Sequence, residues 1–140
     1  MVHSHHGPFP FTPSSYGLLL SHVFVTAEYP IFIAEDGDGK VDAYIVCKII
    51  DGVVWVESLF VSEQERRKGI ATRLYLETEK VAQELGNSTL YNWGHPNNDK
   101  MIAFLSRMGY DVLNLIEVRK KLNNEEITGM VKVGDHDYHY

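Results

Sequence analysis

Three cations stand side by side ahead of a helical pattern in the stretch "VESLFVSEQERRKGIATRL", residues 56–74. Arg66, Arg67 and Lys68 come directly before Gly69, where the helical spacing begins. Because a helix N-terminus carries partial positive charge, each exposed cation there costs about 0.3–1 kcal/mol. The free backbone N–H groups of such an end bind anions, and basic side chains add charge-assisted bonds to phosphate oxygens. The stretch therefore predicts a binding site for an anion.

The position of Gly69, the single glycine of this stretch, limits the kind of anion that the loop can bind. The loop lacks the G-x-x-x-x-G-K-[ST] pattern of nucleoside triphosphatases and the glycine triplet of dinucleotide folds. Gly69 and Ala71 lack the bulk that would keep a ligand away from the backbone. We therefore expect a cofactor that carries a diphosphate, and not a nucleotide that is hydrolysed.

A strand must lead into this loop and a helix must follow it. The run "VVWVESLFV" reads as a strand, and apolar residues then recur on one helical face until Gly86 ends the helix. These residues are Ile70, Leu74, Val81 and Leu85. Since strand, helix and strand in succession form a right-handed crossover, the short run "STLYNW" should pair parallel to the strand that ends at Val61.

Further strands are expected upstream. The runs "IFIAE" and "VDAYIVCKII" flank the turn "DGDGK", and Asp51-Gly52 joins the second run to "VVWVESLFV", so three antiparallel strands are predicted. The stretch "DGDGKVD" is similar to the start of a calcium-binding loop. Its twelfth position from Asp36 is Cys47 where a bidentate glutamate is needed, so we interpret it as a turn.

The remaining elements lie at the two ends. The run "SSYGLLLSHVFVTAEY" has helical spacing, and we predict a helix that starts at Ser14 or Ser15 and ends at Pro30. Downstream, Asn97 or Asn98 should cap a second helix that ends at Gly109. Two strand-like runs then follow, "YDVLNLIEVRKKL" and "TGMVKVGDHDYHY".

Composition limits the class of protein. With 140 residues, 44% of them hydrophobic, we expect an irregular leader at residues 1–13 and one α/β domain at 14–140. The histidines of the leader, His3, His5 and His6, are interpreted as a surface tail, and no metal site is expected. The net charge of -6 argues against nucleic acid as a partner and suits a cationic substrate such as an amine. The single cysteine, Cys47, is expected in the core of a protein of the reducing cytoplasm, with no membrane partner.

The loop and the second helix together resemble a known family. "RRKGIA" matches the [RQ]-x-x-G-x-[GA] acetyl-coenzyme A loop of the GNAT superfamily of N-acetyltransferases, and "VESLFV" looks like the strand before that loop. The later "NNDKMIAFLSRMGY" is similar to the family's second cofactor segment. The resemblance covers residues 31–122 and points to a prokaryotic-type member. It implies a mixed central sheet splayed between its fourth and fifth strands and flanked by helices, with the family's first strand and helix not evident before Ser14.

The resemblance implies roles for individual residues. The backbone of Leu59, Phe60 and Val61 would pair with the pantetheine arm of acetyl-coenzyme A, and the segment Arg66, Arg67, Lys68, Gly69, Ile70, Ala71 and Thr72 would hold its diphosphate. Asn98 would bond to the cofactor arm, cap a helix, or do both. The acceptor would be an amine-bearing small molecule or peptide, and a homodimer is a candidate assembly.

The sequence offers a candidate for the base that deprotonates the amine, whereas the acid that protonates the leaving thiolate stays open. Glu57, a carboxylate in an otherwise apolar strand, is the candidate base that takes the proton of the amine, with substrate orientation and a plain surface role as the alternatives. Leu105 stands where many family members have a tyrosine acid, which leaves Tyr91 and His95 as candidate substitutes. The function expected is acetyl transfer to a primary amine by direct attack in a ternary complex. The alternatives are a non-catalytic acyl-coenzyme A sensor and a pure interaction module.

Overall fold

A computed structural model of the chain describes residues 19–26 and 29–140, with side-chain surroundings from residue 29 onward. The chain divides into two compact units, residues 1–93 and residues 94–140. Each unit is described by itself. Within the described residues, no helix is both long and apolar enough to cross a membrane.

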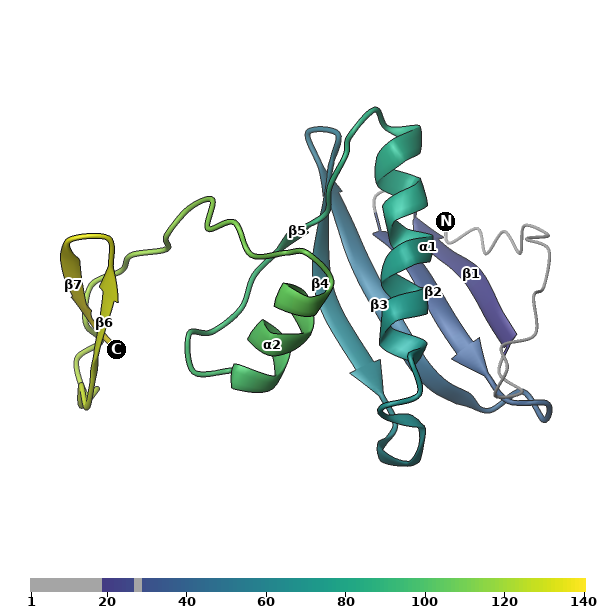
Figure 1. Cartoon of the computed structure of the whole chain (residues 1–140), viewed down its shortest axis with the longest axis horizontal. Coiled ribbons are helices and arrows are strands. Elements are labelled where there is room, and N and C mark those ends of the chain that lie inside the picture. Colours follow the sequence, from purple (N-terminus) through teal and green to yellow (C-terminus); the bar gives the residue numbers. More distant parts are fainter. Residues whose placement is uncertain (1–18, 27–28) are drawn as a thin grey trace. The chain divides into compact units, whose positions relative to one another are not determined.

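The first unit contains a five-stranded sheet in the order β1-β2-β3-β4-β5 (Figure 1). Its strands are β1 (Leu19–Thr26), β2 (Tyr29–Glu35), β3 (Val41–Ile50), β4 (Val53–Val61) and β5 (Tyr91–Asn92). The first four strands are antiparallel neighbours, and β5 is parallel to β4. These pairings confirm the three predicted antiparallel strands and the parallel crossover.

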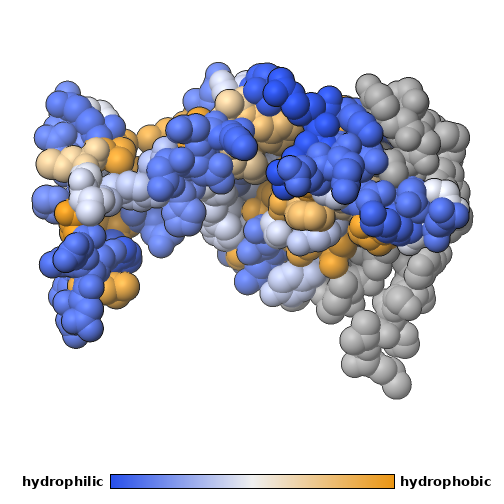
Figure 2. All heavy atoms as spheres, turned by 90° about the horizontal axis from the view of Figure 1, so that it is seen from below, coloured by the Kyte–Doolittle hydropathy of each residue, from blue (hydrophilic) through white to orange (hydrophobic). Residues whose placement is uncertain are grey.

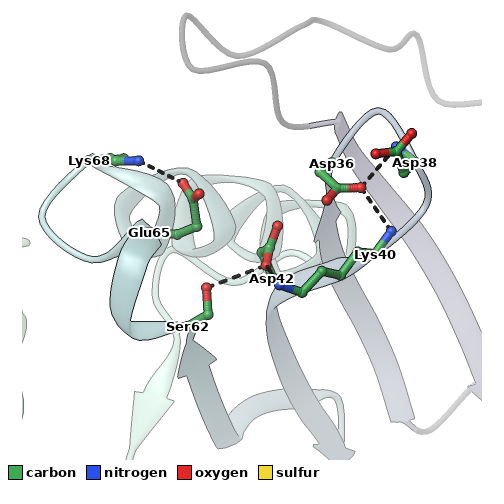
Figure 3. A network of polar contacts seen from close by, with 7 residues as sticks. All are labelled: Asp36, Asp38, Lys40, Asp42, Ser62, Glu65 and Lys68. Atoms are coloured by element: carbon green, nitrogen blue, oxygen red, sulfur yellow. Dashed lines mark hydrogen bonds and ion pairs between the residues drawn. The ribbon is translucent and has the colours of Figure 1, made fainter.

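The two predicted hairpin turns are also present. Between β3 and β4, Asp51 and Gly52 both have positive φ, 51° and 76°, as a two-residue hairpin turn requires. Between β2 and β3, Asp36 Oδ1 accepts hydrogen bonds from the backbone N–H groups of Asp38 (2.9 Å) and Lys40 (3.0 Å). Asp36 thus serves the turn itself, which supports the interpretation of "DGDGK" as a turn (Figure 3).

The helix predicted from Ser14 or Ser15 to Pro30 is wrong in its described part. Residues Leu19–Thr26 form strand β1, and Pro30 lies inside strand β2; the start of the expected helix is outside the described residues. Apolar residues are frequent in this run, so helical spacing could be found in it by chance. The β-branched residues of "VFVT" and the available edge of β2, with Leu19 opposite Glu35, favour a strand.

Helix α1 (Ile70–Glu84) covers one face of the sheet (Figure 1). Its buried residues include Ile70, Leu74 and Ala82, and alternate residues of the strands pack against this face of the helix. These strand residues are Phe32, Ala34, Ala43, Ile45, Cys47, Val54 and Val56. The helix ends as predicted, because Gly86 has φ 83° and the N–H groups of Gly86 and Asn87 donate to the carbonyls of Gln83 and Ala82.

The second unit contains helix α2 (Asp99–Arg107) and a hairpin of β6 (Met130–Val133) and β7 (His136–His139). The helix confirms the prediction, with Asn98 as its N-cap and Gly109 after its end. The run "TGMVKVGDHDYHY" forms two strands that pair with each other. The strand predicted in "YDVLNLIEVRKKL" is wrong, because no strand occurs between α2 and β6.

No residue of this second unit is buried. In "YDVLNLIEVRKKL", Val112 is 86% exposed and Leu115 is 76% exposed. Figure 2 shows hydrophobic residues (orange) reaching the surface among hydrophilic ones (blue). A strand is stable only where a neighbouring strand pairs its backbone groups, and within its own unit this run has no such neighbour.

Candidate active site

The loop between β4 and α1, residues 62–69, has the backbone shape of an anion-binding loop. Arg67 and Gly69 both have left-handed backbones, with φ 63° and 76°. For a residue other than glycine this conformation costs roughly 1–3 kcal/mol, and such strain gathers at ligand-binding sites. Gly69 is the N-cap of α1 and provides no side-chain cap, so the first N–H groups of the helix, from Ile70 onward, are open to a ligand.

The cationic side chains of this loop are arranged unequally. Arg66 Nε donates to the carbonyl of Val61 at 2.9 Å, which ties the loop to the end of β4. Lys68 Nζ lies 3.1 Å from Glu65 Oε2 in an ion pair. Arg67 is exposed and makes no ion pair within the described residues. Of the three predicted cations, Arg67 is therefore the one whose charge is least compensated.

The first residue of the loop, Ser62, is anchored to strand β3 (Figure 3). The backbone N–H of Ser62 donates to the carbonyl of Asp42 at 2.7 Å, and Ser62 Oγ lies 3.5 Å from Asp42 Oδ1. The carboxylate of Asp42 is buried and pairs with Lys40 Nζ at 3.5 Å. These contacts fix where β4 ends and the loop begins.

Strands β4 and β5 separate after a short contact, and we call this point the fork. Only two residue pairs join them, Trp55 with Tyr91 and Val56 with Asn92. Strand β4 continues to Val61, so among the described residues no strand pairs with its backbone from Glu57 onward on the β5 side. The splay predicted between the fourth and fifth strands is confirmed. The predicted pantetheine-binding residues Leu59, Phe60 and Val61 lie on this unpaired edge.

Glu57 lies at the fork itself. On β3, Val46 pairs with Ser58 and Cys47 pairs with Val56, so Glu57 is the extra residue of a β-bulge. Its side chain is exposed. A bulge turns a side chain out of the regular alternation of a strand, and bulges are frequent next to active sites.

A partly buried hydrogen bond supports the fork on the α1 face. The hydroxyl of Tyr75, a fully buried residue of α1, donates to Asn92 Oδ1 at 2.9 Å. Burial raises the pKa of Tyr75 above its usual range, so the phenol keeps its proton. Sequence analysis missed this pair. The signal was a tyrosine on the apolar face of α1, because a buried phenol needs a hydrogen-bond partner.

Cys47 lies close by in the core, as predicted, with no exposed surface. Burial is the main cause that raises the pKa of its thiol to about 12; the hydrogen bond with Thr78 lowers it, and the charge of Glu57 raises it. A thiol in this state is protonated at neutral pH and is a poor nucleophile.

An aromatic group supports the fork on the face opposite α1. The rings of Trp55 and Trp93 are stacked, 4.3 Å between centroids and 16° between planes, and Tyr91 lies 5.1 Å from Trp55. We call Trp55, Tyr91 and Trp93 the aromatic stack. Since Val54 and Val56 face α1, Trp55 between them faces the other way.

The remaining predicted site residues lie elsewhere. Asn98, in the second unit, caps α2 with its Oδ1, which accepts the N–H of Met101 at 3.2 Å. The interpretation as a cap is thus confirmed, and a bond to the cofactor stays a prediction. Leu105 is a residue of α2. Of the two candidate acids, Tyr91 belongs to the aromatic stack and His95 is exposed in the second unit, and neither assignment is tested.

Comparison with known proteins agrees with this architecture. The sequence matches the acetyltransferase (GNAT) family over residues 2–110. No curated protein sequence matches the chain.

Several solved structures share the fold. The aminoglycoside acetyltransferase AAC(6')-Iy, bound to the bisubstrate analogue CoA-S-monomethyl-acetylneamine, is similar with a TM-score of 0.59 and 21% identity over 69% of this chain and 72% of that one. AAC(6')-Ih from Acinetobacter baumannii has a TM-score of 0.59 and 20% identity over 70% and 74%. A nourseothricin acetyltransferase has a TM-score of 0.54 and 24% identity over 64% and 55%.

The open end of α1, the left-handed loop and the unpaired edge of β4 thus define an acyltransferase of the α/β class. The chain belongs to the GNAT acetyltransferase family. Enzymes of this family use acetyl-coenzyme A as co-substrate, and the residues present fit it. The uncapped N-terminus of α1 and Arg67 suit its diphosphate, and the edge of β4 suits the amides of its pantetheine arm.

Proposed function

We propose that the protein transfers the acetyl group of acetyl-coenzyme A to a primary amine of a small molecule or peptide, by direct attack in a ternary complex. The observation that carries this proposal is the fork, where the bulged, exposed Glu57 adjoins an unpaired strand edge that leads to the helix N-terminus. Bound acetyl-coenzyme A would supply an activated thioester. The protein's residues would position it, take one proton and stabilise negative charge.

In this proposal Glu57 takes the proton of the amine. A primary amine with a pKa of about 10 is mostly protonated at neutral pH, so a base, directly or through water, must free its lone pair before it can attack. Backbone N–H groups on the unpaired part of β4, from Leu59 to Val61, would donate to the oxygen that becomes negative during attack.

The state of Cys47 supports direct attack over a covalent acetyl-enzyme. It is the only cysteine of the chain, it is buried, and its thiol has a pKa of about 12. A thiol that is neither accessible nor ionised cannot accept the acetyl group from the co-substrate. Initial rates measured at several concentrations of both substrates should therefore give intersecting reciprocal plots; parallel plots would contradict direct attack.

The proposal is tested by release of free coenzyme A over a panel of primary amines and peptide N-termini. Glu57→Gln should keep co-substrate affinity and lower kcat/KM by about 10²–10⁴-fold, the usual contribution of general acid-base catalysis. Glu84→Gln, the same change at the exposed far end of α1, is the matched control and should keep full activity.

Other results would separate the alternatives. If Glu57→Gln raises KM and leaves kcat unchanged, Glu57 orients a cationic acceptor and is not the base. Binding of acetyl-coenzyme A without turnover on any amine would favour the sensor. Absence of binding would favour the interaction module.

A further inference from the structure

The sheet face opposite α1 carries aromatic side chains that the proposed chemistry does not use. Trp93 is 53% exposed and Phe60, which stacks on Tyr44 at 5.5 Å, is 43% exposed. Within the described residues of this unit, helix α1 packs on the other face of the sheet.

From this arrangement we propose that the aromatic stack is the binding platform for the acceptor, and that the acceptor is an amine carried on a flat aromatic ring by a short linker. This inference rests on the proposed function. It adds a specificity site made of Trp55, Tyr91 and Trp93 and a substrate class.

The location of the stack supports this role. The residue pair Trp55–Tyr91 is one of the two that join β4 to β5, so the stack lies at the fork. The diphosphate end of the co-substrate is expected at the start of α1, on the opposite face. Two substrates that approach the fork from opposite faces do not compete for space, as a ternary complex requires.

The geometry of the stack favours a flat ring. Trp55 and Trp93 are nearly parallel, and one indole of the pair, Trp93, is half exposed. A further aromatic ring laid on Trp93 would continue the offset stacking already present, which ring quadrupoles favour. Exposed Trp and Tyr side chains are typical centres of binding energy because they bury a large area with few rotatable bonds.

The position of the proposed base beside the stack favours a short linker. Glu57 follows Trp55 by two residues on β4, so the proposed base and the stack belong to the same short stretch of strand. A ring on the stack would therefore need only a short chain to carry an amine to the carboxylate. Lys48 pairs with Trp55 from β3, but its ammonium lies over the ring of Tyr29, 5.8 Å from the centroid.

The chain offers a direct probe of this platform. It contains two tryptophans, Trp55 and Trp93, and both belong to the stack, so all intrinsic tryptophan emission comes from the proposed site. The full chain is first saturated with coenzyme A and then titrated with 2-phenylethylamine. We expect the tryptophan emission to change and to reach a plateau. The ring-free amine n-hexylamine should change it much less at equal concentration.

Acetylation rates supply the second measurement. We expect the wild type to prefer 2-phenylethylamine over n-hexylamine in kcat/KM, and Trp93→Leu to reduce this preference by about 2- to 12-fold, the usual effect of an aromatic pair. Trp93→Phe keeps a ring and should keep most of the preference. Coenzyme A affinity, measured by calorimetry, should be equal in all three proteins, which shows that the variants fold.

Each failure has a distinct meaning. Acetylation with the same amine preference in wild type and Trp93→Leu, together with unchanged emission, would overturn the platform and leave the stack as an anchor for β5, while the proposed function would stand. A preference for glucosamine over 2-phenylethylamine that depends on Trp93 would overturn the aromatic class. Saturable quenching without acetylation of any amine would contradict the proposed function, and the stack would then bind an aromatic amine that is not an acetyl acceptor.

Discussion

In the unit of residues 1–93, the apolar run of β3 lies between two paired strands, and Ala43, Ile45 and Cys47 have no exposed surface. In the unit of residues 94–140, the run "YDVLNLIEVRKKL", which is also rich in Val, Leu and Ile, has no strand partner, and Val112 and Leu115 are mostly exposed. Both runs have the composition of strands. The difference teaches that composition sets the tendency to extend, whereas burial depends on a neighbour that completes the backbone hydrogen bonds.

The sharpest test of this comparison is the loss of one leucine side chain in each unit. Leu74→Ala, on the fully buried face of α1, should lower the free energy of unfolding by about 2–5 kcal/mol, because it removes apolar burial and leaves a cavity. Leu113→Ala, at a side chain that is 69% exposed, should change it by less than about 0.5 kcal/mol. Urea titration of both variants gives the two values. A large cost at Leu113 would show that its segment is covered in solution.

The helix ends behave alike in both units, and they were the most predictable part of the fold. Gly86 after α1 and Gly109 after α2 both have positive φ, 83° and 90°, and both ends make the same pair of backbone hydrogen bonds. These features depend on a few neighbouring residues, so one sequence suffices to predict them. The strand pairing of "SSYGLLLSHVFVTAEY" depends on β2, and for this reason the sequence pattern alone was misleading there.

The features of the candidate site also separate into those set by neighbouring residues and those set by contacts between distant elements. The loop residues from Arg66 to Gly69 and the role of Asn98 as a cap could be predicted, because helix termini have local signatures. The bulge at Glu57, the bond between Tyr75 and Asn92, and the stacking of Trp93 on Trp55 could not. Each joins elements that only the folded sheet brings together, and one sequence contains no information on their register.

Substitution of glycine by valine should distinguish the N-terminus of α1, which is proposed to bind the co-substrate, from helix ends that serve the fold alone. Gly69→Val, at φ 76°, should weaken acetyl-coenzyme A binding at least about tenfold, since a branched side chain bars the ligand from the backbone and strains the loop. Gly86→Val, at the other end of the same helix, imposes similar strain of about 1–2 kcal/mol and should leave the affinity unchanged. An added Cβ meets no atom within 4 Å at either position, so crowding does not differ. Calorimetric titration measures both affinities.

The same substitution at Gly109 extends the comparison to the second unit. Because α2 buries no residue, strain at its end should perturb that helix locally and change the free energy of global unfolding less than Gly86→Val does. Equal losses of global stability would mean that the two units unfold as one, which would contradict the contrast between them.

The smallest expected effect concerns the turn "NNEE" in the second unit. The carboxylate of Glu125 accepts hydrogen bonds from the guanidinium of Arg119, one of them at 2.9 Å, and from the backbone N–H of Leu122 at 2.9 Å. The hydrogen bond with Arg119 is the main cause that lowers the pKa of Glu125 from 4.5 to about 2, and the bond from Leu122 adds to it. Because the folded pKa lies below the unfolded one, the carboxylate stabilises the turn above pH 4.5, and this contribution is lost as the pH falls toward 2.

Carbon-detected NMR of the Glu125 side chain should therefore show a midpoint near pH 2 in the wild type. In Arg119→Gln the midpoint should move up toward 4.5, whereas Lys100→Gln, which removes an equal charge from α2, should leave it in place. The side chains of Arg119 and Glu125 are exposed in part, so salt should weaken their pairing and raise the midpoint as well. A midpoint near 4.5 in the wild type would show that this turn is open in solution. The second unit would then depend on its helix caps and its hairpin alone for order, and the contrast with the buried first unit would be greater still.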